Sequence, residues 1–333
     1  MKRNFVFLLI FIAFLAILII FLNCSHNTSL SGVEYKNGMD GHYRVSPARI
    51  PDKAFFAGEK VPLDMYYVKE SLDRELMVNM YWHTSTILLL KKANRWFPVI
   101  TPILEKNNIP DDFKYLALIE SGLSQVVSPS GAAGFWQFLP GTAKDYGLEV
   151  NDEVDERYHV IKSTEAACQY LSKGYEIFGN WTLVAASYNA GKRRIAEELR
   201  TQKVDNYYDL YLNEETSRYV FRIIAIKTIF NMPEEYGFFL EEKDLYQPIP
   251  TKKVLVEGEI EDLRIFAADN NVTYRTLKEL NPWLRKPFLN NKGKSTYIIS
   301  LPADGFIPRS RIPGVRPDFF EPDTAYPFGP VKN

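Results

Sequence analysis

The sequence predicts a mainly α protein, with a large helical domain followed by a small α+β module. From residue 61 to about residue 239 apolar side chains recur every three or four positions, which is typical of amphipathic helices. After a proline-bearing stretch at 247–250 the pattern changes to short strands and short helices. The chain has 333 residues, 46% of them hydrophobic, which suffices for one large and one small domain.

The expected helices are separated by residues that start or stop helices. Pro110, followed by two acids, suits a helix start, because proline tolerates the first turn and acids complement the N-terminal dipole. Pro140 opens a short helix that Gly147 stops, and Ser163 can cap another. The expected helical ranges are 66–79, 84–97, 110 to about 120, 140–146, 163–178, 181–190 and 219–230. Beyond residue 250, the expected order is strand, helix, helix, strand, at 253–257, 260–270, 274–280 and 296–301.

The first 23 residues predict a signal or membrane anchor. An unbroken apolar run at residues 5–22 follows two basic residues, and as a helix rising about 1.5 Å per residue it would reach roughly 27 Å, close to a bilayer's hydrocarbon thickness. The basic flank places the rest of the chain outside the cytoplasm. Cys24 follows the run, so an uncleaved helix or a lipid on Cys24 would hold the protein to a membrane. We expect a cell-envelope protein that faces the periplasm.

The remaining segments complete the predicted domain organisation. Residues 24–60 are rich in Ser, Asn, Gly and Pro and predict a linker, with order beginning near residue 61. The expected catalytic-sized domain covers 61–245, the small module 251–304, and an extended, proline-rich tail 305–333.

Charge and cysteine usage exclude some partners and cofactors. A formal net charge of −1 gives no reason to expect nucleic acid. Cys168 fits a helix as a small buried hydrophobe, and we expect no disulfide between it and Cys24. The four histidines are not spaced as metal ligands, so neither a metal nor another cofactor is predicted.

A carboxylic acid, Glu120, closes an apolar helix. Phe113, Leu116 and Ala117 precede it by seven, four and three residues and share its helix face, and the other faces are apolar too. Burial removes hydration from a carboxylate and raises its pKa, as a general acid for a glycosidic oxygen requires. From the helix alone, an acid that reaches solvent or pairs with an arginine is the alternative.

A turn with two glycines follows at residues 131–138. Gly131 and Gly134 let the backbone bend tightly and approach a ligand. Trp136 offers a flat apolar face to a pyranose ring, and Gln137 can both donate and accept hydrogen bonds. A structural turn beside a core tryptophan is the alternative interpretation.

A third motif, ASYNAG at residues 186–191, ends a helix. We expect Gly191 to stop the helix in a left-handed cap, which leaves Tyr188 and Asn189 able to face a cleft. A phenol and an amide are suitable partners for sugar hydroxyl and acetamido groups. Taken alone, the motif is also a common helix ending.

Together these motifs resemble the SLT-type lytic transglycosylases, the lysozyme-like enzymes that cut bacterial cell-wall glycan. Family members show Glu-Ser, Ser-Pro, Gly-x-x-Gly-Leu-Met-Gln, Ala-Tyr-Asn-Ala-Gly and a tyrosine in a late helix. The corresponding residues here are Glu120-Ser121, Ser128-Pro129, Gly131 to Gln137, Ser187 to Gly191, and Tyr219. The resemblance covers roughly residues 62–240 and is closest to the membrane-bound lytic murein transglycosylase D branch. It implies a lysozyme-like (goose-type) all-α catalytic domain.

The chain departs from this family pattern at two places. Phe135-Trp136 replaces Leu-Met, and Ser187 replaces the usual alanine. Because these changes keep apolar or small character, we expect the shape of the pocket to shift and its chemistry to remain, with Trp136 altering which sugar subsite is favoured.

The small module resembles a diverged LysM-type glycan-binding domain. Asn281 and the closing Ser300-Leu301-Pro302 carry this resemblance, whereas the glycine-threonine start typical of LysM is absent. A structural module without a ligand is the alternative.

The catalytic resemblance implies peptidoglycan as the substrate and Glu120 as the single acid and base. Glu120 would protonate the oxygen of the β-1,4 bond between MurNAc and GlcNAc, and would then draw the proton from the 6-hydroxyl that attacks C1, leaving a 1,6-anhydro end. No other acid between Glu120 and Asn189 lies in a motif, and an internal nucleophile needs no second carboxylate. The residues that would position the sugar and hold Glu120 are, by the same resemblance, Ser128, Gln137, Tyr188, Asn189 and Tyr219.

Two other functions stay open at this point. A muramidase-type hydrolase would use water as the acceptor and would require a second carboxylate opposite Glu120. A catalytically silent scaffold would instead grip glycan through Trp136 and the C-terminal module.

Overall fold

The computed structural model describes residues 45–293 and 295–306. Within these ranges no helix combines the length and the apolar character needed to cross a membrane. The predicted anchor at 1–23, Cys24 and nearly all of the predicted tail lie outside the described residues.

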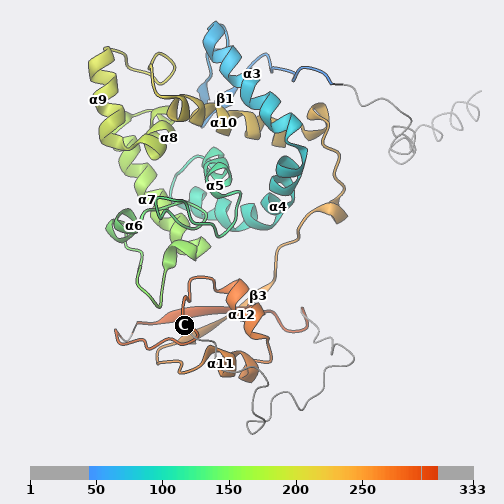
Figure 1. Ribbon diagram of the computed structural model, residues 1–333, viewed down its shortest axis with the longest axis vertical. Helices are drawn as coiled ribbons and strands as arrows, with labels where there is room; N and C mark the ends of the chain where they lie inside the picture. Colours follow the sequence, from blue (N-terminus) through green and yellow to red (C-terminus); the bar gives the residue numbers. More distant parts are fainter. Residues whose placement is uncertain (1–44, 294, 307–333) are drawn as a thin grey trace, which may run out of the picture. The chain divides into compact units, whose positions relative to one another are not determined.

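Helices dominate residues 66–244, as predicted (Figure 1). The α-helices are α3 (Tyr66–Tyr81), α4 (His83–Lys106), α5 (Lys114–Ser121), α6 (Pro140–Asp145), α7 (Val160–Phe178), α8 (Trp181–Ala190), α9 (Lys192–Gln202) and α10 (Glu214–Asn231). Short 3-10 turns are η1 (Asp111–Phe113), η2 (Glu156–Tyr158), η3 (Pro233–Tyr236) and η4 (Glu242–Asp244).

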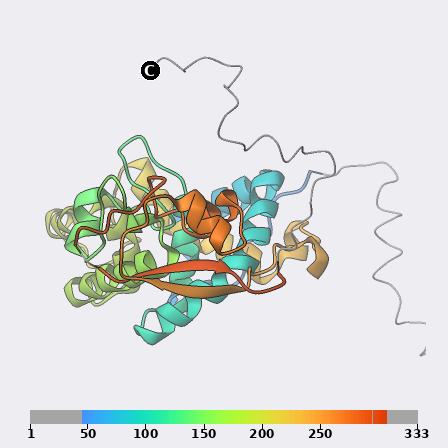
Figure 2. The ribbon, with the colours of Figure 1, turned by 90° about the horizontal axis from the view of Figure 1, so that it is seen from below.

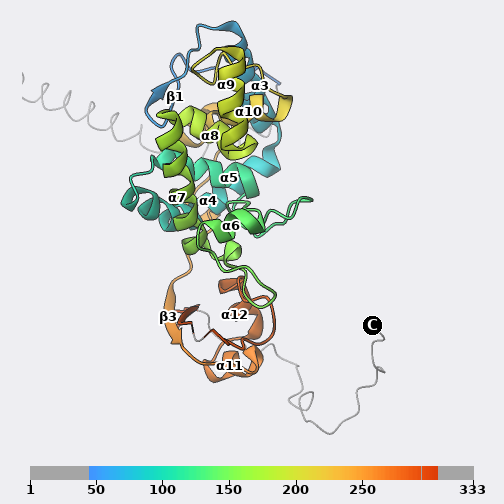
Figure 3. The same ribbon diagram turned by 90° about the vertical axis from the view of Figure 1, so that its left-hand side faces the viewer.

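The helix that ends in Glu120 and Ser121, α5, lies among the other helices of this part (Figures 1 and 3). It packs against α4 and α10, while α10 also packs on α3 and α8. Four consecutive residues of α5, 115–118, are buried, and Gly122 ends the helix with a left-handed φ of 57°. The predicted burial of this helix is confirmed, because apolar side chains on all its faces meet neighbouring helices.

The C-terminal module has the predicted strand–helix–helix–strand order. β3 (Thr251–Val256) pairs antiparallel with β4 (Tyr297–Pro302), and the two strands lie side by side in Figure 2. Between them come α11 (Leu263–Asp269) and α12 (Tyr274–Leu280), which pack on each other, and α12 also packs on β4. The mainly α class with a small α+β module is therefore confirmed.

One asparagine joins the last helix of this module to its last strand. Asn281 is fully buried, and its amide nitrogen donates to the carbonyls of Leu277 (2.9 Å) and Ser300 (2.7 Å). Its amide oxygen accepts from the Ser300 N–H at 2.8 Å. Both ends of the amide are therefore satisfied inside the protein, which is the condition under which a buried polar group is tolerated.

The folded part begins before residue 61, so the linker predicted for 24–60 is wrong in its last residues. β1 (Phe55–Phe56) and β2 (Glu59–Lys60) form a hairpin around Ala57 and Gly58, whose φ angles are 51° and 83°. Phe56 is fully buried, and its ring lies 5.3 Å from that of Phe113. Strands of two residues are too short to show an alternation of apolar and polar side chains, so the sequence pattern does not predict this hairpin.

The hairpin also reaches a distant helix start. The Glu59 carboxylate accepts hydrogen bonds from the backbone N–H groups of Trp181 (2.6 Å) and Thr182 (2.9 Å), and from the Thr182 hydroxyl (2.6 Å). An acid at this place satisfies N–H groups that have no partner within α8 and complements its dipole.

Several helix ends differ from the prediction. α4 continues past Phe97 through Pro98 and Pro102, and its later turns bury Ile100 and Leu104 against the core. His159, rather than Ser163, caps α7, because its ring accepts from the Lys162 N–H. The predicted range of α8 is confirmed, although Gly191 has φ 88° and ψ 138° instead of a left-handed helical cap.

Candidate active site

Glu120 lies half-buried in the last turn of α5, where the Tyr219 hydroxyl of α10 donates a hydrogen bond to Oε1 of its carboxyl group. Burial raises the pKa of Glu120 above its ordinary value and outweighs the other influences. The Tyr219 hydrogen bond and the charge of Arg222 act to lower this pKa, whereas the charge of Glu215 acts to raise it. The result is a carboxyl group that holds its proton more tightly than an exposed glutamate.

Two tyrosines adjoin this carboxyl group. Burial and the nearby charge of Glu120 raise the pKa of Tyr219 and of Tyr188 well above the ordinary phenol value. Both side chains therefore keep their protons and act as donors. Tyr188 donates to the backbone carbonyl of Trp136 at 2.6 Å, which links α8 to the glycine turn.

The expectation that Trp136 presents its ring to a sugar is wrong. Trp136 is 0% exposed, and its indole N–H donates to the Thr164 hydroxyl at 2.9 Å inside the core. An indole buried on all sides with its single donor satisfied has no face left for a ligand. The alternative interpretation, a structural turn beside a core tryptophan, holds for this residue.

The glycine turn owes its shape to a close backbone approach. Gly134 has φ 77°, and a Cβ there would lie 1.9 Å from the carbonyl oxygen of Arg157. The close approach is therefore to the protein's own backbone. Gln137 has φ 49°, and its amide nitrogen donates to the carbonyls of Gly134 (2.8 Å) and Val126 (3.1 Å).

Ser128 belongs to the same loop. Its hydroxyl accepts from the Ala132 N–H at 3.0 Å and lies 2.9 Å from the Ser130 hydroxyl. Among the described residues, the side-chain hydrogen bonds of Ser128 and Gln137 stay within the loop, so neither residue is joined directly to Glu120.

A buried ion pair between Arg157 and Asp155 holds this loop in place, and neither residue lies in one of the sequence motifs. Arg157 forms two charge-assisted hydrogen bonds with Asp155, 2.9 and 2.7 Å long. The same guanidinium donates to the carbonyls of Gly131 (2.8 Å) and Phe138 (3.1 Å), at the two ends of the turn. Bidentate pairing of this kind fixes orientation as well as charge.

Asn189 ties the end of α8 to the first turn of α10. Its amide nitrogen donates to Oε1 of Glu215 at 3.1 Å, and its amide oxygen accepts from the Thr216 hydroxyl at 2.9 Å. Asn189 thereby holds Glu215, the second acid whose charge acts on Glu120. The family resemblance predicts a role for Tyr219, and no sequence motif points to Glu215, which lies four residues before it.

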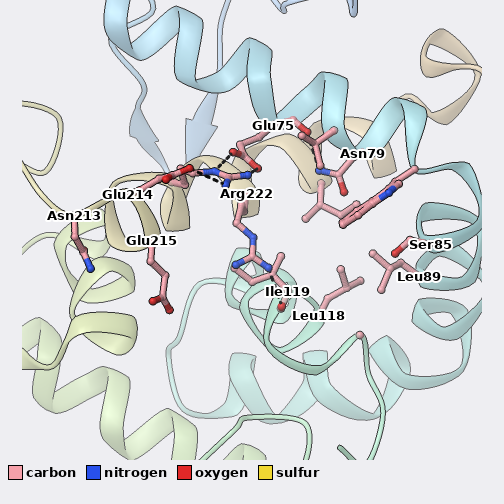
Figure 4. Close-up of a pocket in the computed structure, with 15 residues that line it drawn as sticks. Glu75, Asn79, Ser85, Leu89, Leu118, Ile119, Asn213, Glu214, Glu215 and Arg222 are labelled. Carbon is pink, nitrogen blue, oxygen red and sulfur yellow. Dashed lines mark hydrogen bonds and ion pairs between the residues drawn. The ribbon is translucent and has the colours of Figure 1, made fainter. Parts of the chain in front are cut away.

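A pocket of about 810 Å³ opens next to the C-terminal end of α5, and Glu120 itself is not among the residues that line it (Figure 4). Ile119 and Gly122, which flank the Glu120–Ser121 pair, line it from α5, and Glu215 and Arg222 line it from α10. Its volume lies in the range of small-molecule sites. Among the described residues no group of three or more His, Cys, Asp or Glu could hold a metal ion.

Two family models match this chain. Residues 99–210 match the transglycosylase SLT domain, and residues 252–305 match the soluble lytic transglycosylase C-terminal LysM-like domain. The chain carries an SLT domain followed by a LysM-like domain. Both predicted resemblances are confirmed.

Curated relatives match part of the chain. Membrane-bound lytic murein transglycosylase D of Escherichia coli K12 is 30% identical over 183 residues, which are 53% of this chain and 40% of that protein. The putative tributyltin chloride resistance protein of Alteromonas sp. strain M-1 is 31% identical over 116 residues, covering 34% of this chain and 55% of that protein. The chain thus spans less than two thirds of these relatives.

Two solved structures also align. The 70 kDa soluble lytic transglycosylase of Escherichia coli gives a TM-score of 0.37 at 17% identity, over 53% of this chain and 33% of that one. The lytic transglycosylase Slt of Pseudomonas aeruginosa gives a TM-score of 0.34 at 18% identity, over the same shares.

Proposed function

We propose that this protein is a peptidoglycan lytic transglycosylase that cleaves the β-1,4 bond between MurNAc and GlcNAc. The observation that carries the proposal is the carboxyl group of Glu120, which Tyr219 holds and whose pKa is raised by burial; its neighbours Ile119 and Gly122 line a pocket. A raised pKa keeps a general acid protonated near neutral pH. The SLT-domain match and the lytic transglycosylase named among the relatives support the same reaction.

In the proposed mechanism Glu120 acts twice. It first gives its proton to the glycosidic oxygen, so the bond from C1 to that oxygen breaks and C1 becomes electron-poor. Glu120, now a carboxylate, then accepts the proton of the sugar's 6-hydroxyl group, while the oxygen of that hydroxyl forms a bond to C1. The product is a 1,6-anhydro-MurNAc end. An internal nucleophile has a high effective concentration and needs no activated water.

The neighbouring groups would hold Glu120 and the sugar. Tyr219 donates to the carboxyl group, fixes its orientation and stabilises the carboxylate that forms after proton transfer. Tyr188 and Asn189 would contact the sugar from the end of α8, where Asn189 also holds Glu215. Gln137 and Ser128 would bind substrate from the loop that Arg157 orders.

A muramidase-type hydrolase is the second candidate, and one observation favours it. Glu215 lies near enough to Glu120 for its charge to raise that residue's pKa, so a second carboxylate is present. In hydrolysis such a group could activate water. Its hydrogen bond from Asn189 gives it another role, holding α8 to α10, and transglycosylation does not require it as a base.

Product analysis tests the proposal. Purified peptidoglycan should release muropeptides with 1,6-anhydro ends, identified by mass spectrometry. Reducing ends in their place would transfer the assignment to the hydrolase. Binding to insoluble peptidoglycan without any release would support a silent scaffold.

We also propose that the protein works in the cell envelope, attached through residues 1–23 or a lipid on Cys24. The membrane-bound relative supports an envelope location. On this proposal the catalytic domain extends to residue 245 and includes the hairpin at 55–60, and the module at 251–304 adds affinity for glycan strands. Mass spectrometry of the mature N-terminus would decide between an uncleaved helix and a lipid on Cys24. A protein that carries no lipid and does not associate with membranes would refute both modes of attachment.

A further inference from the structure

Two arginines one helical turn apart on α10 have opposite surroundings. Arg218 pairs with the buried Glu75 (2.7 Å) and with Glu214 (3.4 Å). Among the described residues Arg222 forms no ion pair, and its one hydrogen bond is a long one, 3.4 Å, from Nη2 to the Ile119 carbonyl. Figure 4 shows Arg222 among the residues that line the pocket, near Ile119.

None of the three acids that line the pocket forms an ion pair with Arg222. Glu75 and Glu214 are held by Arg218, and Glu215 accepts from Asn189. Glu120 must be protonated to act as an acid, and it then carries no charge to offset Arg222. A half-buried guanidinium with unused donors therefore faces a pocket of about 810 Å³.

A cation at this place conflicts with the proposed reaction. The charge of Arg222 reaches Glu120, whose pKa it lowers. Cleavage of a glycosidic bond makes the sugar C1 positive, and a bare cation nearby would oppose that charge. An anionic group on the substrate would remove the conflict, and a carboxylate fits the planar fork of a guanidinium.

We propose that Arg222 binds a carboxylate of the muramyl substrate in this pocket, so that the enzyme recognises the acidic substituent as well as the sugar chain. This inference rests on the proposed function. Peptidoglycan offers two sources of the same chemistry: the lactyl carboxylate of glycan stripped of peptide, and the carboxylates of the stem peptide. Trp82, which is 70% exposed, lines the same pocket and leaves an apolar face beside the substituent.

The test is a binding cycle in the full chain with Glu120→Gln, so that no cleavage occurs. Four soluble ligands are compared by calorimetry: stripped muramyl glycan, glycan bearing stem peptides, and each of these with its carboxylates converted to carboxamides. Conversion should weaken binding about tenfold when Arg222 is present, as expected for loss of one charge-assisted hydrogen bond. With Arg222→Gln added, conversion should change nothing, and Arg222→Lys should keep part of the effect.

The pattern across ligands identifies the source. An effect with stripped glycan assigns the lactyl carboxylate, and an effect confined to peptide-bearing glycan assigns the stem peptide. Equal responses with and without Arg222, or no binding of any ligand, overturn the proposal. Because anhydro products are measured separately on the native chain, failure here leaves the proposed reaction standing.

Two arginines provide controls for a merely structural effect. Arg194→Gln, on the exposed face of α9, should leave all affinities unchanged. Arg218→Gln should lower Tm, since it leaves the buried Glu75 unpaired, whereas Arg222→Gln should not. A Tm loss in Arg222→Gln equal to that in Arg218→Gln would mark Arg222 as structural and overturn the inference.

Discussion

Glu120 and Asn281 are both polar side chains at the C-terminal end of a short helix, the apolar α5 in one domain and the mostly polar α12 in the other. Asn281 is fully buried and uses its amide nitrogen and oxygen in three hydrogen bonds to backbone groups. Glu120 is half-buried, and among the described residues Tyr219 provides the one hydrogen bond to its carboxyl group.

This difference in surroundings distinguishes a group with a structural role from a group that can take part in a reaction. The Asn281 amide gains nothing from a ligand, because its hydrogen-bonding capacity toward the backbone is used. The Glu120 carboxyl group has its pKa raised by burial and retains an oxygen for a substrate, so it can exchange a proton. Position at a helix end is common to both, and the surroundings decide the role.

The largest expected effect is on cleavage by Glu120→Gln. The amide cannot deliver a proton, so turnover of peptidoglycan should fall roughly 10³-fold, within the range for general acids. Glu165→Gln, an exposed acid on α7, is the matched control and should retain activity. Release of muropeptides measures both, and cleavage surviving in Glu120→Gln would remove this residue from its role.

Next in size is the effect of Asn281→Ala on stability. Three hydrogen bonds are lost and buried backbone groups are left unpaired, which should cost about 2–4 kcal/mol of unfolding free energy in the C-terminal module. Asn270→Ala is the control at the end of α11, where the side chain makes one local bond of 2.8 Å, and it should cost about 1 kcal/mol or less. Urea denaturation measures both, and equal costs would contradict the structural role assigned to Asn281.

Tyr219→Phe should have a smaller effect, visible in the pH profile. Loss of the phenol removes a hydrogen bond that lowers the pKa of Glu120, so that pKa should rise further. The acid form then persists to higher pH, and the alkaline limb of kcat should move upward while the rate at its optimum falls about tenfold through lost orientation. An unchanged alkaline limb would separate Tyr219 from the acid.

The smallest effect is expected for Glu215→Gln. Its charge raises the pKa of Glu120, so its removal should lower that pKa and move the alkaline limb of kcat to lower pH, opposite to Tyr219→Phe. If kcat is otherwise retained, Glu215 is not the base of a hydrolase. A loss as large as that in Glu120→Gln would favour the hydrolase instead.

Local patterns carried much of the fold and of the site. The range 181–190 was predicted in full, because Asn180 caps α8 and Gly191 ends it, and both signals lie in adjacent residues. Glu120 could be found because its helix is apolar all round. Trp136 could not be assigned from sequence, since a tryptophan suits a core and a sugar platform equally, and burial decides between them.

Contacts between residues far apart in the sequence could not be predicted from local patterns. The Arg157 side chain meets the Gly131 carbonyl 26 positions away, and Asn189 meets Glu215 also 26 positions away. Neither partner lies in a motif that names the other. Only the packing of the helices brings these pairs together, so no local pattern points to Arg157 or Glu215.

The bond from Glu59 to the start of α8 bears on how a shortened chain should be made. A chain that begins at residue 61 would contain every motif of the SLT resemblance, yet it would lack the carboxylate that caps α8. The far end of α8 carries Tyr188 and Asn189, so fraying at one end would loosen side chains at the other. Weak activity in such a fragment would result from the loss of Glu59. A fragment that starts before residue 48 would retain this residue.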